Sequence, residues 1–248
     1  MRSRVEVVSE VTDDGTPVLV RLRADGALAV RRTGPATVHL VGTAAGPLGG
    51  DVVEIDLVVR AGARLEVEGV AATVALPGAA GDGATWVVTA DVADGADLRC
   101  APQPLVVSRG AVLRTTTRLA LAPTARADVV EQIVLGRHGE PAGTWSGRLV
   151  ADVGGVPVVR QTQSSHLLAA GPYPPGAGPP RALVSRLLLG GAPVAGPATS
   201  GAAVLCPLAA GGTLLTAYAA DLGTALRDLT DVRADVRAVT PLAGTTAG

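Results

Sequence analysis

The densest group of polar side chains in the sequence lies at residues 131–140. Glu131 and Glu140 bracket a segment that reads Glu-Gln-Ile-Val-Leu-Gly-Arg-His-Gly-Glu, with Gly136 and Arg137 near its centre. Carboxylates arranged in this way could hold a partner or contact a passing cation. They could equally flank a tight turn between two strands, where Gly136 takes a positive φ and Arg137 pairs with a carboxylate. Spacing alone favours the turn.

A second candidate is the motif Pro102-Gln103-Pro104. Each proline fixes its own φ and removes a backbone donor, so the motif predicts a rigid bend. Such a bend would aim the Gln103 amide inward, along the wall of a cavity. The residue types alone favour the purely structural interpretation.

Other chemistry finds little support in the sequence. The three histidines, His39, His138 and His166, fit no His-x-His or His-Glu-x-x-His spacing. We expect His39 to be structural within a strand and His166 to lie at a surface edge. Cys100 and Cys206 are too few for a disulfide framework and predict two buried thiols in a reducing compartment. No serine lies in a nucleophile elbow, and the absence of lysine excludes a phosphate-binding loop that ends in Gly-Lys.

The composition limits the possible partners and compartments. The formal net charge of −1 gives no strong field toward nucleic acid or an anionic membrane. There is no signal peptide and no apolar run long enough to span a membrane, so we expect a cytoplasmic protein. Phenylalanine is absent, and aromatic residues make up 2% of the chain. The core must therefore consist of valine, leucine, isoleucine and alanine.

The elements that position these residues follow from period-2 patterns. Alternation of apolar and polar residues predicts strands at 18–23, 27–32, 36–42, 52–59, 64–68, 84–92, 104–108, 112–119, 126–135, 144–153, 155–161, 181–189, 202–206 and 212–219. Helical spacing predicts an amphipathic helix at about 222–237, capped by Asp221 or Thr224. The segment 171–180, rich in proline and glycine, predicts an exposed, mobile loop.

Similar Gly-Ala corners recur between the predicted strands. They lie at Gly62-Ala63, Gly95-Ala96 and Gly110-Ala111, with a weaker copy at 121–129. Their spacing is too irregular for a strict solenoid and predicts layered sheets whose hairpins share one corner type. The fold class is therefore mainly β. It is a single layered or β-helix-like domain over residues 1–240 that includes the C-terminal helix, followed by a flexible tail at 241–248.

Taken in chain order, these segments resemble the family of the urease accessory protein UreD, called UreH in some bacteria. The matching residues are Gly46, Leu48, Gly49, Gly50 and Asp51; Gly62–Leu65 and Ala71–Thr73; Gly95–Leu98 and Pro102–Leu105; Gly110 and Ala111; and Glu131, Leu135–Arg137, Gly139 and Glu140. The sequence departs from the family where a Thr-Thr-Gln stretch is usual, since residues 67–70 read Val-Glu-Gly-Val. It also has Ala101 where leucine usually precedes the Pro-Gln-Pro motif.

The resemblance implies a maturation scaffold rather than an enzyme. Proteins of this family bind the urease apoprotein and the accessory F protein, and the accessory G GTPase joins that assembly to deliver nickel. A water-filled tunnel is the proposed nickel route. The resemblance places tunnel or partner-contact residues at Gly49, Gly50, Asp51, Thr73, Pro102, Gln103, Pro104, Glu131, Gly136, Arg137 and Glu140. It implies no tightly bound cofactor and no stable metal site, with Ni²⁺ in transit making weak contacts at Asp51, Glu66, Glu68 and Glu131.

Two other function classes compete with the scaffold. One is a non-catalytic β-rich module that binds a protein or a carbohydrate, and the other is a hydrolase of unrecognised type. Sugar-binding faces usually display exposed aromatic side chains, which this chain can hardly supply. The missing nucleophile and metal-binding patterns weigh against the hydrolase.

Overall fold

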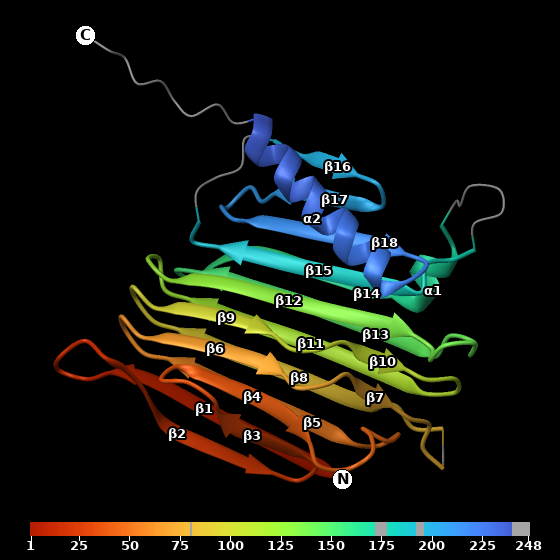
Figure 1. Cartoon of the computed structure of the whole chain (residues 1–248), viewed down its shortest axis with the longest axis horizontal. Helices are drawn as coiled ribbons and strands as arrows, with labels where there is room; N and C mark the ends of the chain where they lie inside the picture. Colours follow the sequence, from red (N-terminus) through yellow and green to blue (C-terminus); the bar gives the residue numbers. More distant parts are fainter. Residues whose placement is uncertain (80, 172–177, 192–195, 240–248) are drawn as a thin grey trace.

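The computed structural model describes residues 1–79, 81–171, 178–191 and 196–239, which form two β-sheets packed face to face (Figure 1). Sheet A has seven strands in the spatial order β14-β13-β11-β8-β5-β1-β2. Their bounds are β1 Arg2–Val11, β2 Pro17–Asp25, β5 Val52–Val59, β8 Ala84–Val92, β11 Val112–Leu121, β13 Thr144–Val153 and β14 Val156–Ser164.

Sheet B contains eleven of the described strands. Nine lie in the order β16-β17-β18-β15-β12-β9-β6-β4-β3, while β10 pairs with both β12 and β7. Their bounds are β3 Leu28–Arg32, β4 Thr37–Gly42, β6 Arg64–Gly69, β7 Thr73–Ala75, β9 Asp97–Ala101, β10 Leu105–Val107, β12 Arg126–Leu135, β15 Ala182–Leu189, β16 Ala198–Ser200, β17 Ala203–Pro207 and β18 Thr213–Ala219.

The chain passes back and forth between the two sheets as a stack of coils. In sheet A, β5, β8, β11 and β13 are parallel and in register, and in sheet B so are β4, β6, β9 and β12. Figure 1 shows these coils rising in sequence order from the N-terminal strands to the C-terminal ones. The predicted mainly β, β-helix-like fold is therefore confirmed.

The recurring Gly-Ala corners share one geometry. Their glycines all have positive φ, with values of 69°, 65° and 76° at Gly62, Gly95 and Gly110. The amide of the next alanine donates to the carbonyl three residues earlier at 2.9–3.1 Å. The prediction of hairpins was wrong, because each corner joins a strand of one sheet to a strand of the other. Neighbouring strands therefore come from successive coils and pair in parallel, which a tight hairpin does not allow.

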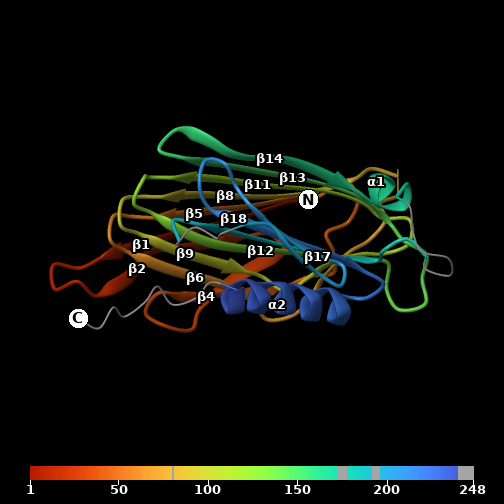
Figure 2. The same ribbon diagram turned by 90° about the horizontal axis from the view of Figure 1, so that it is seen from above.

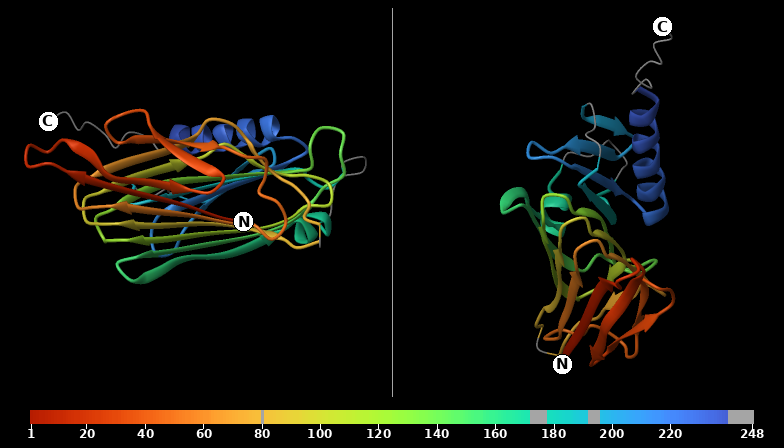
Figure 3. Two further views of the ribbon diagram at one scale, coloured as in Figure 1. Left: turned by 90° about the horizontal axis from the view of Figure 1, so that it is seen from below. Right: turned by 90° about the vertical axis from the view of Figure 1, so that its left-hand side faces the viewer.

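The core lies between the inner faces of the two sheets. In β5 the residues Val53, Ile55, Leu57 and Val59 point inward and are at most 5% exposed, as the alternation predicts. Trp145 lies in the same layer and donates from Nε1 to Thr115 Oγ1 at 3.2 Å. Sheet B extends beyond the edge of sheet A at β14, as the end-on view shows (Figure 3).

Helix α2 (Leu222–Val239) covers one face of this extension of sheet B. The helix lies on the side of sheet B that faces away from sheet A (Figure 2) and contacts β15, β16, β17 and β18. Asp221 caps it by accepting from the Thr224 amide at 2.9 Å. Ala225, Leu229 and Val232 are buried, whereas Leu226 is 38% exposed at the rim. The predicted helix is confirmed, while the 241–248 tail and residues 172–177 of the predicted loop lie outside the described residues.

Three local predictions were wrong or incomplete. The strands β1, β7 and β16 were not predicted, although in β1 the alternation of Val5 and Val7 with Arg4 and Glu6 is of the predicted kind. Cys206 is exposed on β17 rather than buried, whereas Cys100 is buried as expected. His166 lies in the short helix α1 (Ser165–Ala169). No helix of the described residues combines the length and apolarity that crossing a membrane requires.

Candidate functional site

A cavity of about 50 Å³ lies between the sheets at the level of β9, β10 and β12. Its apolar wall includes Trp86 and Leu105, and its polar wall includes Thr117, Gln103 and Glu131. To hold a water molecule, a buried space needs a volume of roughly 10–15 Å³ and two or more polar partners for that water. The cavity therefore has the size and the polar groups to hold a few water molecules.

Glu131 is the charged group of this cavity. It lies on the inward row of β12, and Thr117 donates to its Oε1 at 2.5 Å from β11 of the facing sheet. Burial raises the pKa of Glu131, and the hydrogen bond from Thr117 lowers it by less. The side chain is half-buried because it borders the cavity itself. None of the ion pairs within the described part of the chain involves it.

Cys100 borders the same cavity from β9. Burial, with a smaller contribution from the nearby charge of Glu131, raises the pKa of its thiol to about 12. Cys100 therefore stays a protonated, weakly coordinating group at neutral pH, since the thiolate is the form that binds metals. The oxygen atoms of the cavity wall are the stronger potential donors to a cation.

The cavity opens where the ladder of sheet B is interrupted. β9 pairs with β12 as far as Cys100 and Val129, and β10 resumes pairing only at Leu105 and Ile133. The intervening Pro102-Gln103-Pro104 segment is the predicted bend, and it leaves a stretch of β12 without a strand partner on that side. Gln132 partly bridges the gap by donating from Nε2 to the Pro102 carbonyl at 3.1 Å.

A groove of about 310 Å³ lies on the outer side of this gap. It is bounded by Glu68, Arg99 and Arg186 of sheet B and by Leu226 and Thr230 of α2. The groove shares three bordering residues with the interior cavity: Gln103, Val130 and Gln132. These residues therefore lie between the inner space and the outer one, and Gln103 is exposed there rather than aimed inward as predicted.

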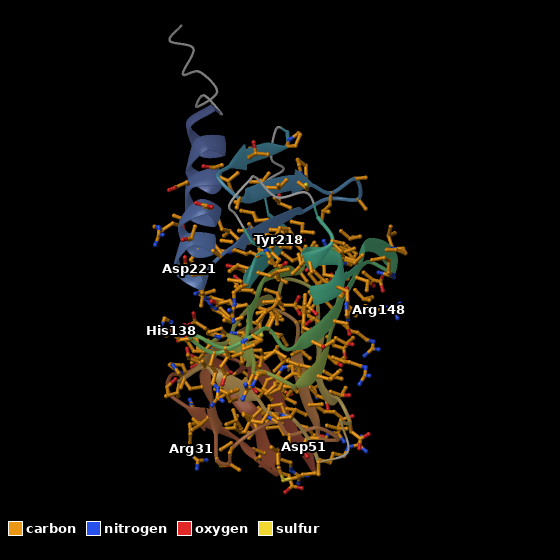
Figure 4. The ribbon with its side chains drawn as sticks, turned by 90° about the vertical axis from the view of Figure 1, so that its right-hand side faces the viewer. Arg31, Asp51, His138, Arg148, Tyr218 and Asp221 are labelled. Atoms are coloured by element: carbon orange, nitrogen blue, oxygen red, sulfur yellow. The ribbon has the colours of Figure 1, made fainter. Side chains whose placement is uncertain are left out.

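A mouth of about 430 Å³ lies on the other side of the cavity. It shares five bordering residues with the cavity: Leu28, Gly42, Ala71, Thr73 and Trp86. Asp51 stands in the mouth at the start of β5, near the N-terminal end of the chain (Figure 4). The mouth, the cavity and the outer groove thus adjoin in series across the molecule.

Asp51 is held firmly, unlike Glu131. Its Oδ1 accepts from the α-amino group of Met1 at 2.5 Å, and its Oδ2 accepts from the Leu48 amide at 2.9 Å. Burial acts to raise the pKa of Asp51, but these two donors outweigh it and the net shift is downward. The adjoining Gly49 lies so close to the backbone of Gly78 and Asp82 that a Cβ at position 49 would collide with both. The corner at 46–51 is therefore tightly built.

Comparison with known proteins places this arrangement in a family. The sequence profile described as "UreD urease accessory protein" matches residues 2–246. The chain belongs to the UreD family. A "Urease accessory protein UreD" from Parafrankia sp. (strain EAN1pec) is 38% identical over 95% of this chain and 89% of its own length. "Urease accessory protein UreD 3" from Streptomyces griseus subsp. griseus is 41% identical over 88% and 92%, respectively.

The predicted site residues of this UreD chain fall into separate places. Thr73, Pro102, Gln103 and Glu131 border the cavity, while Asp51 and Arg137 border the mouth. Gly49 and Gly50 form the corner beside Asp51. Pro104 is buried and accepts from the Thr73 amide at 3.0 Å, which ties the bend to β7.

The remaining members of the 131–140 cluster form the turn that spacing favoured. Gly136 has a φ of 86°, and Arg137 donates from Nε to Glu140 Oε1 at 2.9 Å. The hydrogen bond from Arg137 is the main cause that lowers the pKa of Glu140 to about 2. Glu131 faces the interior, so the sequence cluster is split between a surface turn and the cavity.

Glu66 and Glu68 point outward from β6, because Leu65 and Val67 take the inward positions. Glu66 pairs with Arg99 at 3.0 Å, and Glu68 lies 3.1 Å from His39 Nε2. They therefore border the outer surface of sheet B rather than the interior cavity, and Glu68 reaches the outer groove.

Thr117, Trp86 and Gln132 also border the cavity of this UreD chain, and none of them was predicted as a site residue. The alternation of side chains along β11 predicts that Thr117 points inward, on the same row as Thr115 and Leu119. No local pattern predicts that the inner face of this strand lies opposite Glu131 of the facing sheet.

Proposed function

We propose that this chain is a non-catalytic scaffold of urease maturation in the cytoplasm. It binds the urease apoprotein together with the accessory F protein and the G GTPase, and it lets nickel pass toward the enzyme through its interior. The observation that carries this proposal is the carboxylate of Glu131. It borders a cavity whose lining is mainly apolar, it has no basic partner among the described residues, and it lies between two surface openings.

A carboxylate placed in this way is costly for a protein that only needs to fold. Buried ionisable groups with shifted pKa values concentrate at functional sites, since burial without pairing destabilises the folded state. A divalent cation in the cavity would supply the missing positive charge. Glu131 is therefore better explained as a contact for a transient cation than as a structural group.

The donors around the cavity suit passage rather than retention. A carboxylate, amides and hydroxyls are hard oxygen ligands that leave a hydrated cation exchangeable, whereas clusters of imidazole or thiolate hold Ni²⁺ tightly. The glutamines Gln103 and Gln132 offer amide oxygens at the boundary between cavity and groove. Both amides are neutral, and the two arginines of the adjoining groove, Arg99 and Arg186, are paired with Glu66 and Asp128.

The alternative of a carbohydrate-binding module gains no support from the aromatic residues that the structure describes. Trp86 and Trp145 are buried in the core, and Tyr218 is half-buried with its hydroxyl accepting from Gln163 at 2.8 Å. Sugar recognition would require such rings on the surface.

The proposal is tested by co-expressing the chain with urease and the other accessory proteins and measuring nickel per purified urease. Omitting the chain should leave the enzyme nearly free of nickel. Glu131→Gln keeps the shape of the side chain and removes its charge, and we expect it to reduce nickel loading several-fold while the accessory complex still assembles.

The matched control is Glu54→Gln, which makes the same change on the outer face of sheet A, away from the cavity and both of its openings. We expect normal loading from it. Equal loading by wild type and Glu131→Gln would reject the interior route, and full loading without the chain would reject the scaffold itself.

A further inference from the structure

The outer face of sheet A divides into two halves with different electrostatics. This face is formed by the side chains that alternate with the core residues of β1, β5, β8, β11 and β13. On the β1–β5 half, basic and acidic side chains neutralise one another. Arg2 pairs with Glu54 at 2.8 Å, and Arg4 pairs with Asp56 at 2.9 Å.

The β11–β13 half carries an unneutralised group of three arginines, Arg114, Arg118 and Arg148, which we call the arginine cluster. All three are exposed, and none takes part in a hydrogen bond or ion pair of its side chain among the described residues. Arg148 lies at the outer margin of the molecule, on the side away from α2 (Figure 4).

The sheet register fixes the spacing of the cluster. Arg148 on β13 lies opposite Thr116 on β11, midway between Arg114 and Arg118. With strands about 4.8 Å apart and roughly 6.7 Å between alternate residues, the Cα of Arg148 lies about 8 Å from each of the other two. The neighbouring outward residues are small and neutral, such as Ser146 opposite Arg114.

We propose that the arginine cluster is a docking surface for the acidic face of a protein partner in the urease assembly. This inference rests on the proposed function. Arginine is favoured at protein interfaces because its planar fork binds carboxylates in pairs of hydrogen bonds and loses little hydration on contact. Because none of the three guanidinium groups has an ion-pair partner among the described residues, they are ready to bind carboxylates from outside. The flat array of small side chains between them lets a partner approach closely.

Charge complementarity argues against a second copy of this chain as the occupant. The isologous contact of a two-fold dimer would bring the cluster onto the same face of its partner. That half of the face offers Asp91, while Asp152 is already bonded to Arg160. Like charges would therefore oppose one another.

Nucleic acid also fits the cluster poorly. Binding to single strands relies on exposed aromatic rings for base stacking, and both tryptophans are buried in the core. Binding to duplexes requires a broader basic surface than three residues on a chain of net charge −1. A partner with a few well-placed carboxylates matches the size of the cluster better.

The cluster reaches the corner that flanks the mouth. The Arg114 guanidinium lies over Gly83, where a Cβ would collide with it, and the Gly83 carbonyl accepts from the Gly50 amide at 3.2 Å. A partner that covers Arg114 therefore overhangs the 46–51 corner and the Asp51 side of the interior route. Docking at the arginine cluster would position that partner beside the mouth.

The test compares two variants of the full chain that lose the same charge. The first carries Arg114→Gln, Arg118→Gln and Arg148→Gln. The control carries Arg23→Gln, Arg64→Gln and Arg126→Gln, three exposed arginines of other regions that likewise make no ion pair within the described residues. Binding to purified urease apoprotein and, separately, to purified accessory F protein is measured at low and at high salt, with a heparin surface as a polyanion reference.

We expect the cluster variant to bind one of the two proteins about tenfold more weakly at low salt, and with a shallower salt dependence, because exposed charges act mainly through long-range attraction. The control should bind like wild type. Equal binding of the cluster variant to both proteins overturns the inference and leaves the proposed function standing, even if its heparin binding falls. Failure of wild type to bind either protein overturns both.

Discussion

The mouth and the interior cavity are each bordered by a carboxylate, and the two carboxylates have opposite environments. Asp51 receives an ammonium group and a backbone amide, and the net effect lowers its pKa. Glu131 receives one threonine hydroxyl, and burial raises its pKa. The same chemical group is therefore a satisfied structural anchor in one region and a strained, under-satisfied group in the other.

This difference separates the roles of two residues that sequence comparison alone would group together. A carboxylate that is fully bonded stabilises the fold most when charged, and it has little remaining capacity for a cation. A carboxylate that destabilises the fold when charged remains free to bind a cation. We therefore propose Glu131, rather than Asp51, as the interior contact for a cation, while Asp51 holds the corner at the mouth.

The largest effect is expected from Asp51→Ala. The substitution leaves the Met1 ammonium and the Leu48 amide without their partner, and such a loss costs about 2 kcal/mol for a partly exposed charged pair. Thermal or urea unfolding should show a clear loss of stability. Asp51→Asn keeps an acceptor for the Leu48 amide and should recover part of the loss.

The loss of stability caused by Asp51→Ala should depend on pH. Because the folded-state pKa of Asp51 is lowered, its contribution is present above the ordinary pKa of an aspartate and is lost as the pH falls toward the lowered value. The stability difference between wild type and Asp51→Ala should therefore shrink in acid. A difference that stays constant between neutral and acidic pH would show that Asp51 is not the anchor described here.

A smaller effect of opposite sign is expected from Glu131→Gln. The neutral amide removes the cost of a buried charge and keeps the shape of the side chain, so we expect a gain in the order of 1 kcal/mol at neutral pH. In wild type, the raised folded-state pKa means that stability falls as the pH rises from the ordinary glutamate range through that pKa. The gain from Glu131→Gln should grow over the same interval.

Together with lower nickel loading, a higher stability of Glu131→Gln would identify a group kept for function at a cost to folding. A loss of stability at neutral pH would contradict this and would mean that the carboxylate has a partner that the contacts do not reveal. Thr117→Val serves as the reference, since it removes the hydroxyl donor and should destabilise the charged form of Glu131 further.

The sequence carries most of the fold because its local rules are consistent along the chain. Alternation marked β5, β11 and β12, and glycine marked the corners at Gly62, Gly95 and Gly110. What alternation does not encode is which strand pairs with which. A corner that joins two sheets uses the same turn residues as a hairpin within one sheet. The sequence alone therefore does not distinguish a parallel stack of coils from layers of hairpins.

The candidate site was predictable in its residues but not in its geometry. Glu131 and Gln103 were both named from the sequence, and the bend at Pro102 was expected. The gap in sheet B depends on where β9 stops pairing and β10 begins, which is a relation among three strands. Glu131 and Glu140 likewise lie apart because Glu131 is on the inward row of β12, whereas Glu140 lies in the turn that follows the end of this strand.

The smallest effect is expected at Glu140, whose half-buried carboxylate accepts from Arg137 and from the backbone amide of Arg109. Its pKa of about 2 lies below the ordinary glutamate value, so its contribution to stability is present above that value and is lost as the pH falls toward 2. Solvent and salt screen such a surface pair strongly. Glu140→Gln should therefore lower the melting temperature only slightly at neutral pH, less than Asp51→Ala does, and by progressively less as the pH falls through 2. A large loss at neutral pH would mean that the turn at 136–140 anchors the mouth as firmly as Asp51 does.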